Sequence, residues 1–202
     1  MLKTAVIGVG YLGRFHAQKH AALPECELVG VVDSNSEQAR AVGEELGVPW
    51  HTEPEVVLDQ VDAVSIVVPT SAHHAITKPC LERGIHVLLE KPFAASIEEA
   101  EELTALAQAK GTVLQIGHLE RFNVVYTGFR EQIDKPQFVE NIRIAPFPKR
   151  GTDVDVVLDL MIHDIDLVLA VVQEMPESVE AVGVPILTTS IDLASARLRF
   201  PG

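Results

Sequence analysis

Short apolar runs alternate with longer mixed segments through the first 118 residues of the chain. Each run is rich in Val, Ile and Leu and has turn-favouring residues at its ends, as buried strands do. Strands that are apolar along their whole length are covered by helices on both faces. The pattern therefore predicts an α/β fold with a doubly wound parallel sheet. The expected strands are 4–7, 27–32, 63–68, 85–89 and 113–116.

Two helices between these strands have clear ends. The segment 74–83 is followed by Gly84 and the segment 96–110 by Gly111, and glycine commonly follows the last residue of a helix. Ser96 followed by a glutamate three residues later makes a capping box at the start of the second helix. Further glutamates in its first turns suit the positive end of the helix dipole. We interpret these acids as capping and solvating groups, not as catalytic ones.

The pattern changes after residue 118, where helical and strand-like segments are mixed. The helical segments are expected at 120–133 and 155–172, and the strands at 138–145, 179–184 and 194–200. This mixture predicts an α+β domain built on an open sheet.

We accordingly expect a Rossmann domain at 1–118 and a substrate and oligomerisation domain at 119–202. The sequence ends on Pro201-Gly202, a turn pair that commonly leads into another strand. We therefore expect the second sheet to be incomplete and the chain to be truncated, with homo-oligomers forming through that sheet when it is complete.

Composition narrows the classes of function. A chain of 202 residues with 47% hydrophobic content can bury a sizeable core, and its net charge of −13, without a Lys/Arg run, disfavours nucleic-acid binding. Cys26 and Cys80 lack the spacing of a metal site, so two reduced thiols are expected. No apolar run has the length of a membrane span or the pattern of a signal peptide. We expect a cytoplasmic protein that does not bind membranes.

A glycine motif, Gly8-Val9-Gly10-Tyr11-Leu12-Gly13, lies between the first expected strand and a helix. This is the context that a dinucleotide-binding fingerprint requires. The first glycine permits a tight turn, the second lets the backbone approach a pyrophosphate, and the third lets helix and strand pack closely. The helix N-terminus attracts the phosphates, so the motif predicts a cofactor site that includes Tyr11 and Leu12.

An acidic residue follows the second expected strand. Asp33 lies 20 residues after Gly13, where a carboxylate can hydrogen-bond the hydroxyl groups of the adenosine ribose. The same carboxylate would repel a 2′-phosphate, so NAD is preferred over NADP. Ser34 and Arg40 nearby keep NADP as the less favoured alternative.

Two further loops follow expected strands, at the edge of the sheet where open α/β domains bind ligands. Glu90-Lys91-Pro92 follows one of them, and a lysine beside the oxidised nicotinamide could exchange a proton with a substrate hydroxyl. The alternative is a surface lysine in a loop, and the chemistry alone does not separate the two.

The other loop, Pro69-Thr70-Ser71, leads into His73 and His74 near the expected cofactor crevice. We expect Pro69, Thr70 and His73 to contact the cofactor. The alternative is that Ser71 simply caps the next helix.

The expected helix at 155–172 carries a polar stripe. Asp155, Asp159, His163 and Asp166 recur at helical spacing on one face of an otherwise apolar segment, so the stripe should line a cleft. His163 can abstract a hydroxyl proton, and Asp159 one turn earlier can orient it. A solvated outer face and a structural histidine are the alternatives. A metal site is not expected, because no further ligand set has suitable spacing.

Polar residues after the last Rossmann strand are candidates for substrate contacts. His118, Arg121 and Asn123 leave that strand in the direction of the second domain. Lys149 and Arg150, with Arg143, could bind an anionic substrate group, although isolated basic residues are more often only solvated.

The order of these motifs resembles that of the glucose-fructose oxidoreductase, inositol dehydrogenase and MocA family. The resemblance rests on the glycine fingerprint, Asp33, Pro69-Thr70, Glu90-Lys91-Pro92 and the segment 159–166, and it covers nearly the whole chain. In that family the lysine of the EKP motif and the histidine of a D-x-x-x-H helix act together at the nicotinamide. The resemblance therefore implies that Lys91, Asp159 and His163 are catalytic and that Glu90 lies at the cofactor.

The segments 117–123 and 155–164 resemble, more narrowly, members that oxidise the 3-hydroxyl of UDP-N-acetylglucosamine-type sugars. This resemblance implies an NAD-dependent dehydrogenase acting on a nucleotide sugar. Two alternatives stay open: an inositol or free-sugar dehydrogenase, and a dinucleotide-binding regulatory protein that has lost catalysis.

Overall fold

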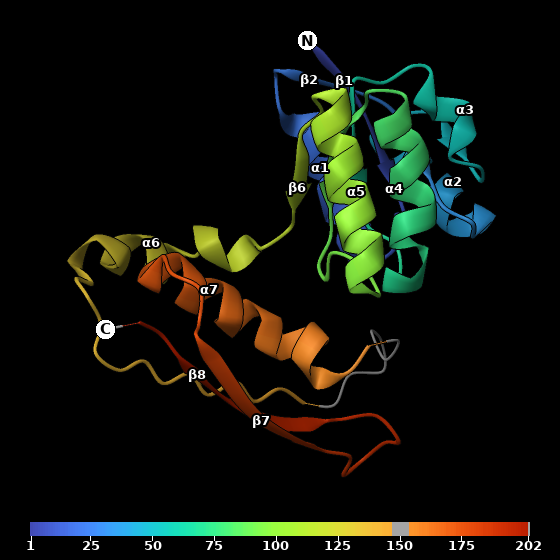
Figure 1. Ribbon diagram of the computed structural model, residues 1–202. Coiled ribbons are helices and arrows are strands. Elements are labelled where there is room, and N and C mark those ends of the chain that lie inside the picture. Colours follow the sequence, from blue (N-terminus) through green and yellow to red (C-terminus); the bar gives the residue numbers. More distant parts are fainter. Residues whose placement is uncertain (147–153, 202) are drawn as a thin grey trace. The chain divides into compact units, whose positions relative to one another are not determined.

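The computed structural model describes residues 1–146 and 154–201. The chain forms two compact units, Met1–Gly117 and His118–Gly202. The first unit contains a six-stranded parallel sheet, and the second contains helices and a two-stranded antiparallel sheet (Figure 1). The architecture is thus a doubly wound α/β domain followed by a smaller α+β unit.

The parallel sheet has the strand order β3-β2-β1-β4-β5-β6. Along the chain, β1 to β3 lie successively further from the centre on one side of the sheet, and β4 to β6 do so on the other side. The direction in which strands are added therefore reverses between β1 and β4. The carboxyl ends of these two strands therefore border the crevice where open α/β sheets bind ligands. The strands are β1 Leu2–Ile7, β2 Cys26–Val32, β3 Trp50–His51, β4 Ala63–Ile66, β5 His86–Leu89 and β6 Leu114–Ile116.

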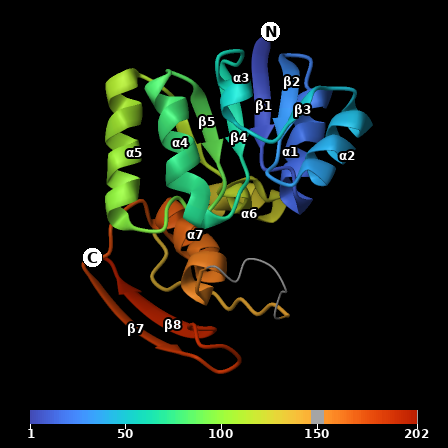
Figure 2. The ribbon, with the colours of Figure 1, turned by 90° about the vertical axis from the view of Figure 1, so that its right-hand side faces the viewer.

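Five α-helices belong to this unit: α1 Tyr11–Ala22, α2 Ser36–Leu46, α3 Glu55–Leu58, α4 His73–Glu82 and α5 Ile97–Lys110. Alternate side chains of a strand face opposite sides of the sheet. Val6 of β1 packs with buried residues of α1 and α2, whereas Ala5 and Ile7 pack with those of α3, α4 and α5. Figure 2 shows the sheet between these two helix layers.

The predicted strands of the first unit are confirmed to within two residues at each end. The edge strand β3 was not predicted, because two residues are too short to carry a pattern. Gly84 and Gly111 have positive φ angles of 77° and 66°, as expected of residues that end helices. Ser96 accepts a hydrogen bond from Glu99 N, while the Glu99 carboxylate accepts one from Ala95 N.

Both cysteines are free thiols. Cys80 lies on the buried face of α4, and burial raises the pKa of its thiol to about 12. Cys26, at the start of β2, is partly exposed.

The second unit begins with short helical turns: the 3₁₀ turn η2 Leu119–Phe122, α6 Val124–Phe129 and the 3₁₀ turn η3 Arg130–Gln132. The π-helical turn η4 Val157–Met161 leads directly into α7 Ile162–Val172. The strands β7 Ser178–Val184 and β8 Leu193–Arg199 form an antiparallel hairpin, which confirms the two strands expected there.

The prediction of a strand at 138–145 is wrong. The segment has the apolar content of a strand, yet the structure assigns it no regular form, and Phe138, Ile142 and Ile144 are exposed. A strand requires a hydrogen-bonding partner. Within the described ranges, the sheet of this unit consists of β7 and β8 alone.

Within residues 1–146 and 154–201, no helix has both the length and the apolar character that crossing a membrane requires.

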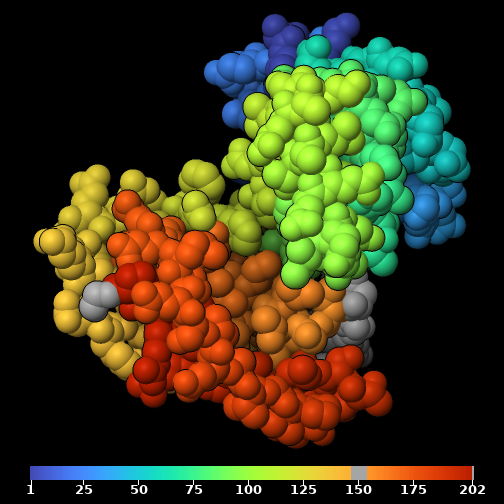
Figure 3. Space-filling view, in the orientation of Figure 1, coloured from blue at the N-terminus to red at the C-terminus, as the bar shows by residue number. Residues whose placement is uncertain are grey.

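The inner face of α5 should contribute much more to stability than its outer face, which is exposed in Figure 3 (yellow-green). Leu103 is fully buried against the sheet, whereas Ile97 is 73% exposed. We expect Leu103→Ala to lower the free energy of unfolding by about 3 kcal/mol, and Ile97→Ala to change it by less than about 0.5 kcal/mol. Urea unfolding followed by circular dichroism measures both. Equal losses in the two variants would contradict this packing.

Candidate active site

The three glycines of the loop between β1 and α1 have different surroundings. A Cβ atom on Gly13 would lie 1.8 Å from the carbonyl oxygen of Gly8, and one on Gly8 would lie 2.2 Å from the oxygen of Val67. These two glycines are therefore required by the protein's own packing. A Cβ on Gly10 would meet no atom within 4 Å. Gly10 thus leaves open space at the N-terminus of α1, and this fits the close approach of a pyrophosphate.

Two large side chains beside this loop are exposed. Tyr11 and Leu12 begin α1, and the Tyr11 ring makes an edge-to-face contact with Phe15 at a centroid distance of 5.4 Å. Neither side chain belongs to the buried core. Both are placed where a ligand bound at the loop could cover them.

Asp33 is held at the carboxyl end of β2 by two backbone groups. Its Oδ2 accepts a hydrogen bond of 2.8 Å from Val9 N, and its Oδ1 accepts one of 2.9 Å from Asn35 N. The carboxylate is thereby fixed beside the glycine loop. A carboxylate oxygen can accept more than one hydrogen bond, so further acceptor capacity is available for ribose hydroxyl groups.

The loops after β4 and β5 carry the next predicted residues. Pro69 precedes the 3₁₀ turn η1 Thr70–Ala72, in which Thr70 is buried. His73 is also buried, with Nδ1 2.9 Å from the carbonyl oxygen of Pro92 and Nε2 3.0 Å from that of Val68. The predicted contact between His73 and the cofactor stays a prediction. The contacts that the structure does show are with backbone.

Glu90 is a buried acid at the end of β5. Its Oε1 lies 3.1 Å from His16 Nε2 of α1, and its Oε2 accepts a hydrogen bond from Lys91 N. Burial alone would raise the pKa of this carboxyl. The hydrogen bonds from His16 and Lys91 N, with the positive charges of both residues, outweigh burial, so the net pKa is lowered. Glu90 is therefore a buried anion that ties α1 to the carboxyl end of β5, directly before Lys91.

In the second unit, the predicted polar stripe is only partly retained. Asp155 accepts hydrogen bonds from Val157 N and Leu158 N and so caps the helix. The turn that contains Asp159 is π-helical, with i→i+5 hydrogen bonding, and this rotates its side chains away from the positions that regular α-helical spacing gives. His163 follows in the first turn of α7. π turns are frequent at functional sites.

The candidate substrate residues of this unit form internal contacts. Arg121 donates two hydrogen bonds, of 2.6 and 2.7 Å, to the buried carboxylate of Asp166, and these raise the pKa of the guanidinium. His118 Nδ1 lies 3.8 Å from the same carboxylate. Asn123 caps α6 by accepting a hydrogen bond from Val125 N.

Arg143 makes an ion pair with Asp164 at 3.0 Å. Lys149 and Arg150 lie outside the described residues.

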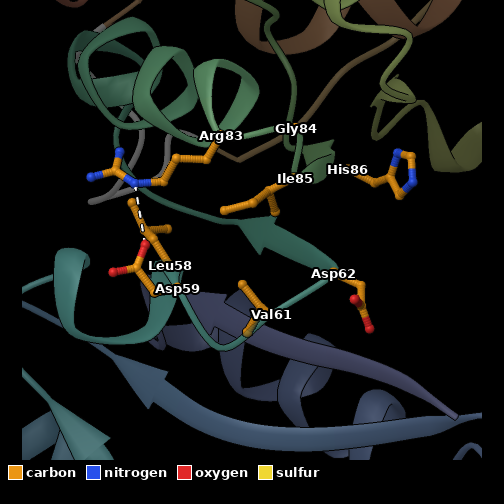
Figure 4. Close-up of a pocket in the computed structure, with 8 residues that line it drawn as sticks. All are labelled: Leu58, Asp59, Val61, Asp62, Arg83, Gly84, Ile85 and His86. Carbon is orange, nitrogen blue, oxygen red and sulfur yellow. Dashed lines mark ion pairs between the residues drawn. The ribbon is translucent and has the colours of Figure 1, made fainter.

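A surface hollow in the first unit lies at the opposite edge of the sheet from the glycine loop. Figure 4 shows it around the amino-terminal ends of β4 and β5, with an ion pair of 3.7 Å between Arg83 and Asp59. It therefore does not coincide with the predicted cofactor site. Its lining residues are Leu58, Asp59, Val61, Asp62, Arg83, Gly84, Ile85 and His86.

Among the residues that the structure describes, no three His, Cys, Asp or Glu side chains lie close enough together to hold a metal ion.

Three features of the site were missed by sequence reasoning. The partner of Glu90 is His16, 74 positions away, and the partner of Arg121 is Asp166, 45 positions away. His73 was identified as a site residue, but its contacts with two loops were not. A single sequence carries no signal for such pairings, because they depend on how distant segments pack.

The glycine loop yields a matched pair of variants. We expect Gly13→Ala to lower the free energy of unfolding by about 3 kcal/mol, because its methyl group would overlap Gly8 O. Gly10→Ala should change it by less than about 0.5 kcal/mol, since the methyl group points into open space. Gly10→Ala should instead weaken NAD binding at least about tenfold, which calorimetry would measure. A stable Gly13→Ala variant would contradict this geometry.

The pairing of Glu90 with His16 makes the stability of the fold depend on pH. A carboxyl whose pKa is lowered in the folded state adds stability above its unfolded pKa, and this is lost as pH falls through the folded value. Between about pH 6 and about pH 3.5, the wild type should therefore lose more stability than Glu90→Gln does. Urea midpoints at both pH values measure this difference. Glu101→Gln, at an exposed position on α5, should lose as much as the wild type, and equal slopes in all three proteins would refute the expectation.

The chain was compared with proteins of known family and structure. Residues 2–118 match the sequence model of the oxidoreductase family with an NAD-binding Rossmann fold that is named for glucose-fructose oxidoreductase, inositol dehydrogenase and MocA. UDP-N-acetylglucosamine 3-dehydrogenase of Acidithiobacillus ferrooxidans is 45% identical over 96% of the chain and 62% of its own length. An NAD-dependent scyllo-inositol 2-dehydrogenase of Bacillus subtilis is 31% identical over 82% of the chain and 52% of its own length.

The fold agrees with these relationships. A solved structure of the Acidithiobacillus ferrooxidans UDP-N-acetylglucosamine 3-dehydrogenase superposes with a TM-score of 0.91 at 44% identity, covering 98% of the chain and 65% of that protein. The chain therefore spans less than two thirds of the length of these relatives. It belongs to the glucose-fructose oxidoreductase, inositol dehydrogenase and MocA family, and its first unit is the NAD-binding Rossmann domain of that family.

Proposed function

We propose that this chain acts as an NAD-dependent dehydrogenase on the 3-hydroxyl group of a UDP-N-acetylglucosamine-type sugar. The observation that carries the proposal is the 45% identity, over 96% of the chain, to an enzyme named for that reaction. The open backbone at Gly10 and the anchored carboxylate of Asp33 support the cofactor half of the proposal.

The catalytic roles follow from the chemistry of three side chains. NAD, when bound, supplies a nicotinamide that accepts hydride from the carbon bearing the hydroxyl group. His163 acts as the general base that takes the hydroxyl proton, and Asp159 orients its ring. The ammonium group of Lys91 stabilises the negative charge that develops on the oxygen.

The cofactor contacts come from the carboxyl edge of the parallel sheet. Gly8, Gly10 and Gly13, with Tyr11 and Leu12, form the pyrophosphate loop, and Asp33 binds the adenosine ribose. Pro69, Thr70 and the Glu90-Lys91 pair serve the nicotinamide half.

The substrate contacts come from the second unit. Arg121 uses only two of its five N–H donors on Asp166, so others can reach an anionic group of the substrate. His118, Asn123 and Arg150 complete the proposed set. The strand β7 is exposed along its length, and we propose that this sheet takes part in a homo-oligomer.

A second candidate substrate is an inositol. It is favoured by the 31% identity to a scyllo-inositol 2-dehydrogenase over 82% of the chain. A neutral polyol offers no diphosphate to basic residues. Removing the charge of Arg121 would therefore weaken the binding of a nucleotide sugar much more than the binding of an inositol.

Asp33 should determine the choice between NAD and NADP. Its carboxylate repels a 2′-phosphate, and Asp33→Asn removes that charge while keeping an oxygen that can accept a backbone hydrogen bond. We expect the affinity for NADP relative to NAD to rise at least about tenfold. Fluorescence titration of both reduced cofactors measures the ratio. Glu37→Gln, at an exposed position of α2, is the control that should leave it unchanged.

The proposed activity is tested by mixing the protein with NAD, UDP-N-acetylglucosamine and a carbonyl reagent that traps the ketosugar. Reduced nicotinamide should accumulate, and Lys91→Ala and His163→Asn should each lower kcat at least about 100-fold. His163→Asn should leave NAD affinity nearly unchanged. Lys110→Ala, at the exposed end of α5, is the control. Turnover of scyllo-inositol without turnover of UDP-N-acetylglucosamine would reject the proposed substrate in favour of an inositol. Turnover unaffected by His163→Asn would remove this residue from the mechanism.

A further inference from the structure

A buried histidine connects the two loops that carry the predicted nicotinamide contacts. His73, the first residue of α4, is 1% exposed. Its Nδ1 faces the carbonyl oxygens of Pro92 and Phe93 at 2.9 and 3.4 Å, and its Nε2 faces that of Val68 at 3.0 Å. Each ring nitrogen thus faces the backbone of a different loop.

These backbone groups adjoin the residues that the proposed function uses. Val68 directly precedes Pro69 and Thr70, and Pro92 directly follows Lys91. The ladder between the neighbouring strands β4 and β5 ends where Glu90 N donates to Ile66 O at 3.0 Å. Beyond that point, the His73 ring provides a further link between the two segments.

The chemistry of the ring suits this connection. An imidazole is rigid and carries a nitrogen on each side, and each nitrogen can donate when it is protonated. A buried carbonyl oxygen without a donor is costly, so the ring favours one arrangement of both loops. A neutral ring donates from one nitrogen at a time. Nδ1 faces two carbonyl oxygens of residues 90–93, the loop after β5 that contains Lys91 and is called the Lys91 loop below, whereas Nε2 faces one carbonyl oxygen.

The other flank of Lys91 is held independently. Glu90, on its amino-terminal side, pairs with His16 at 3.1 Å, while Pro92, on its carboxyl-terminal side, contacts His73. Lys91 is thus fixed at both neighbours, by helices on opposite faces of the sheet.

We propose that His73 is a positioning residue, which holds the backbone of the Lys91 loop through a hydrogen bond from Nδ1 to Pro92 O. This inference rests on the proposed function for the role of Lys91. The link between the loops, however, can be measured without turnover.

Two substitutions of similar polarity separate the two sides of the ring. In His73→Asn the amide nitrogen takes the place of Nδ1 and can still donate to Pro92 O. In His73→Gln it takes the place of Nε2 and can reach only Val68 O. A role limited to filling the core would not favour the shorter asparagine, so the order of the two variants reports on the hydrogen bond.

We expect hydrogen exchange of the backbone amides in residues 91–95 to be faster in His73→Gln than in His73→Asn or the wild type. With NAD and UDP-N-acetylglucosamine, kcat should fall roughly 100-fold in His73→Gln and less than about fivefold in His73→Asn. Equal hydrogen exchange in the two variants, or a greater loss of kcat in His73→Asn than in His73→Gln, would overturn the proposal. Altered exchange with no turnover by the wild type would support the positioning role and reject the proposed function.

A measurement on the wild type covers the case in which both variants unfold. Two-bond ¹H–¹⁵N correlation spectra of the labelled protein identify which ring nitrogens of His73 carry a proton. The proposal requires a proton on Nδ1. A ring protonated on Nε2 alone would overturn it.

Discussion

The contact between α1 and the turn before it is the constraint on which the rest of the first unit depends. Gly13 packs so closely on the carbonyl group of Gly8 that no side chain fits between them. This contact sets where the N-terminus of α1 lies against β1, and with it the open backbone at Gly10. It also sets where His16, one turn further along the helix, can meet Glu90. One packing contact thus determines two parts of the candidate site.

The arrangement of the first unit could be predicted well from sequence, because its signals are local. Apolar runs mark the strands, a fixed spacing of glycines marks the turn, and an acid at the end of the next strand marks the ribose contact. Asp33 illustrates how far this extends. Its position followed from spacing alone, whereas the two backbone groups that hold its carboxylate did not.

The second unit was predicted less well, for identifiable physical reasons. The segment 138–145 has the composition of a strand, but composition does not provide a pairing partner. The polar stripe assumed regular α-helical spacing, and a π turn interrupts it. Asp155 and Asp166 belong to that stripe by spacing, yet one caps the helix and the other binds Arg121. Each error comes from an interaction that a periodic pattern does not encode.

The π turn also makes the number of residues before α7 significant. The hydrogen bonds of a π turn run from residue i to i+5, whereas those of an α-helix run from i to i+4, so the π turn contains one residue more for about the same rotation around the axis. In a regular α-helix each residue advances about 100° around the axis. If Val157–Met161 became α-helical at its present length, His163 would therefore turn by about that angle relative to the cap at Asp155. Deleting one residue while the turn becomes α-helical would instead leave the direction of His163 nearly unchanged. The length of this segment is consequently coupled to its π conformation, and a change in one preserves the direction of His163 only when it is matched by a change in the other.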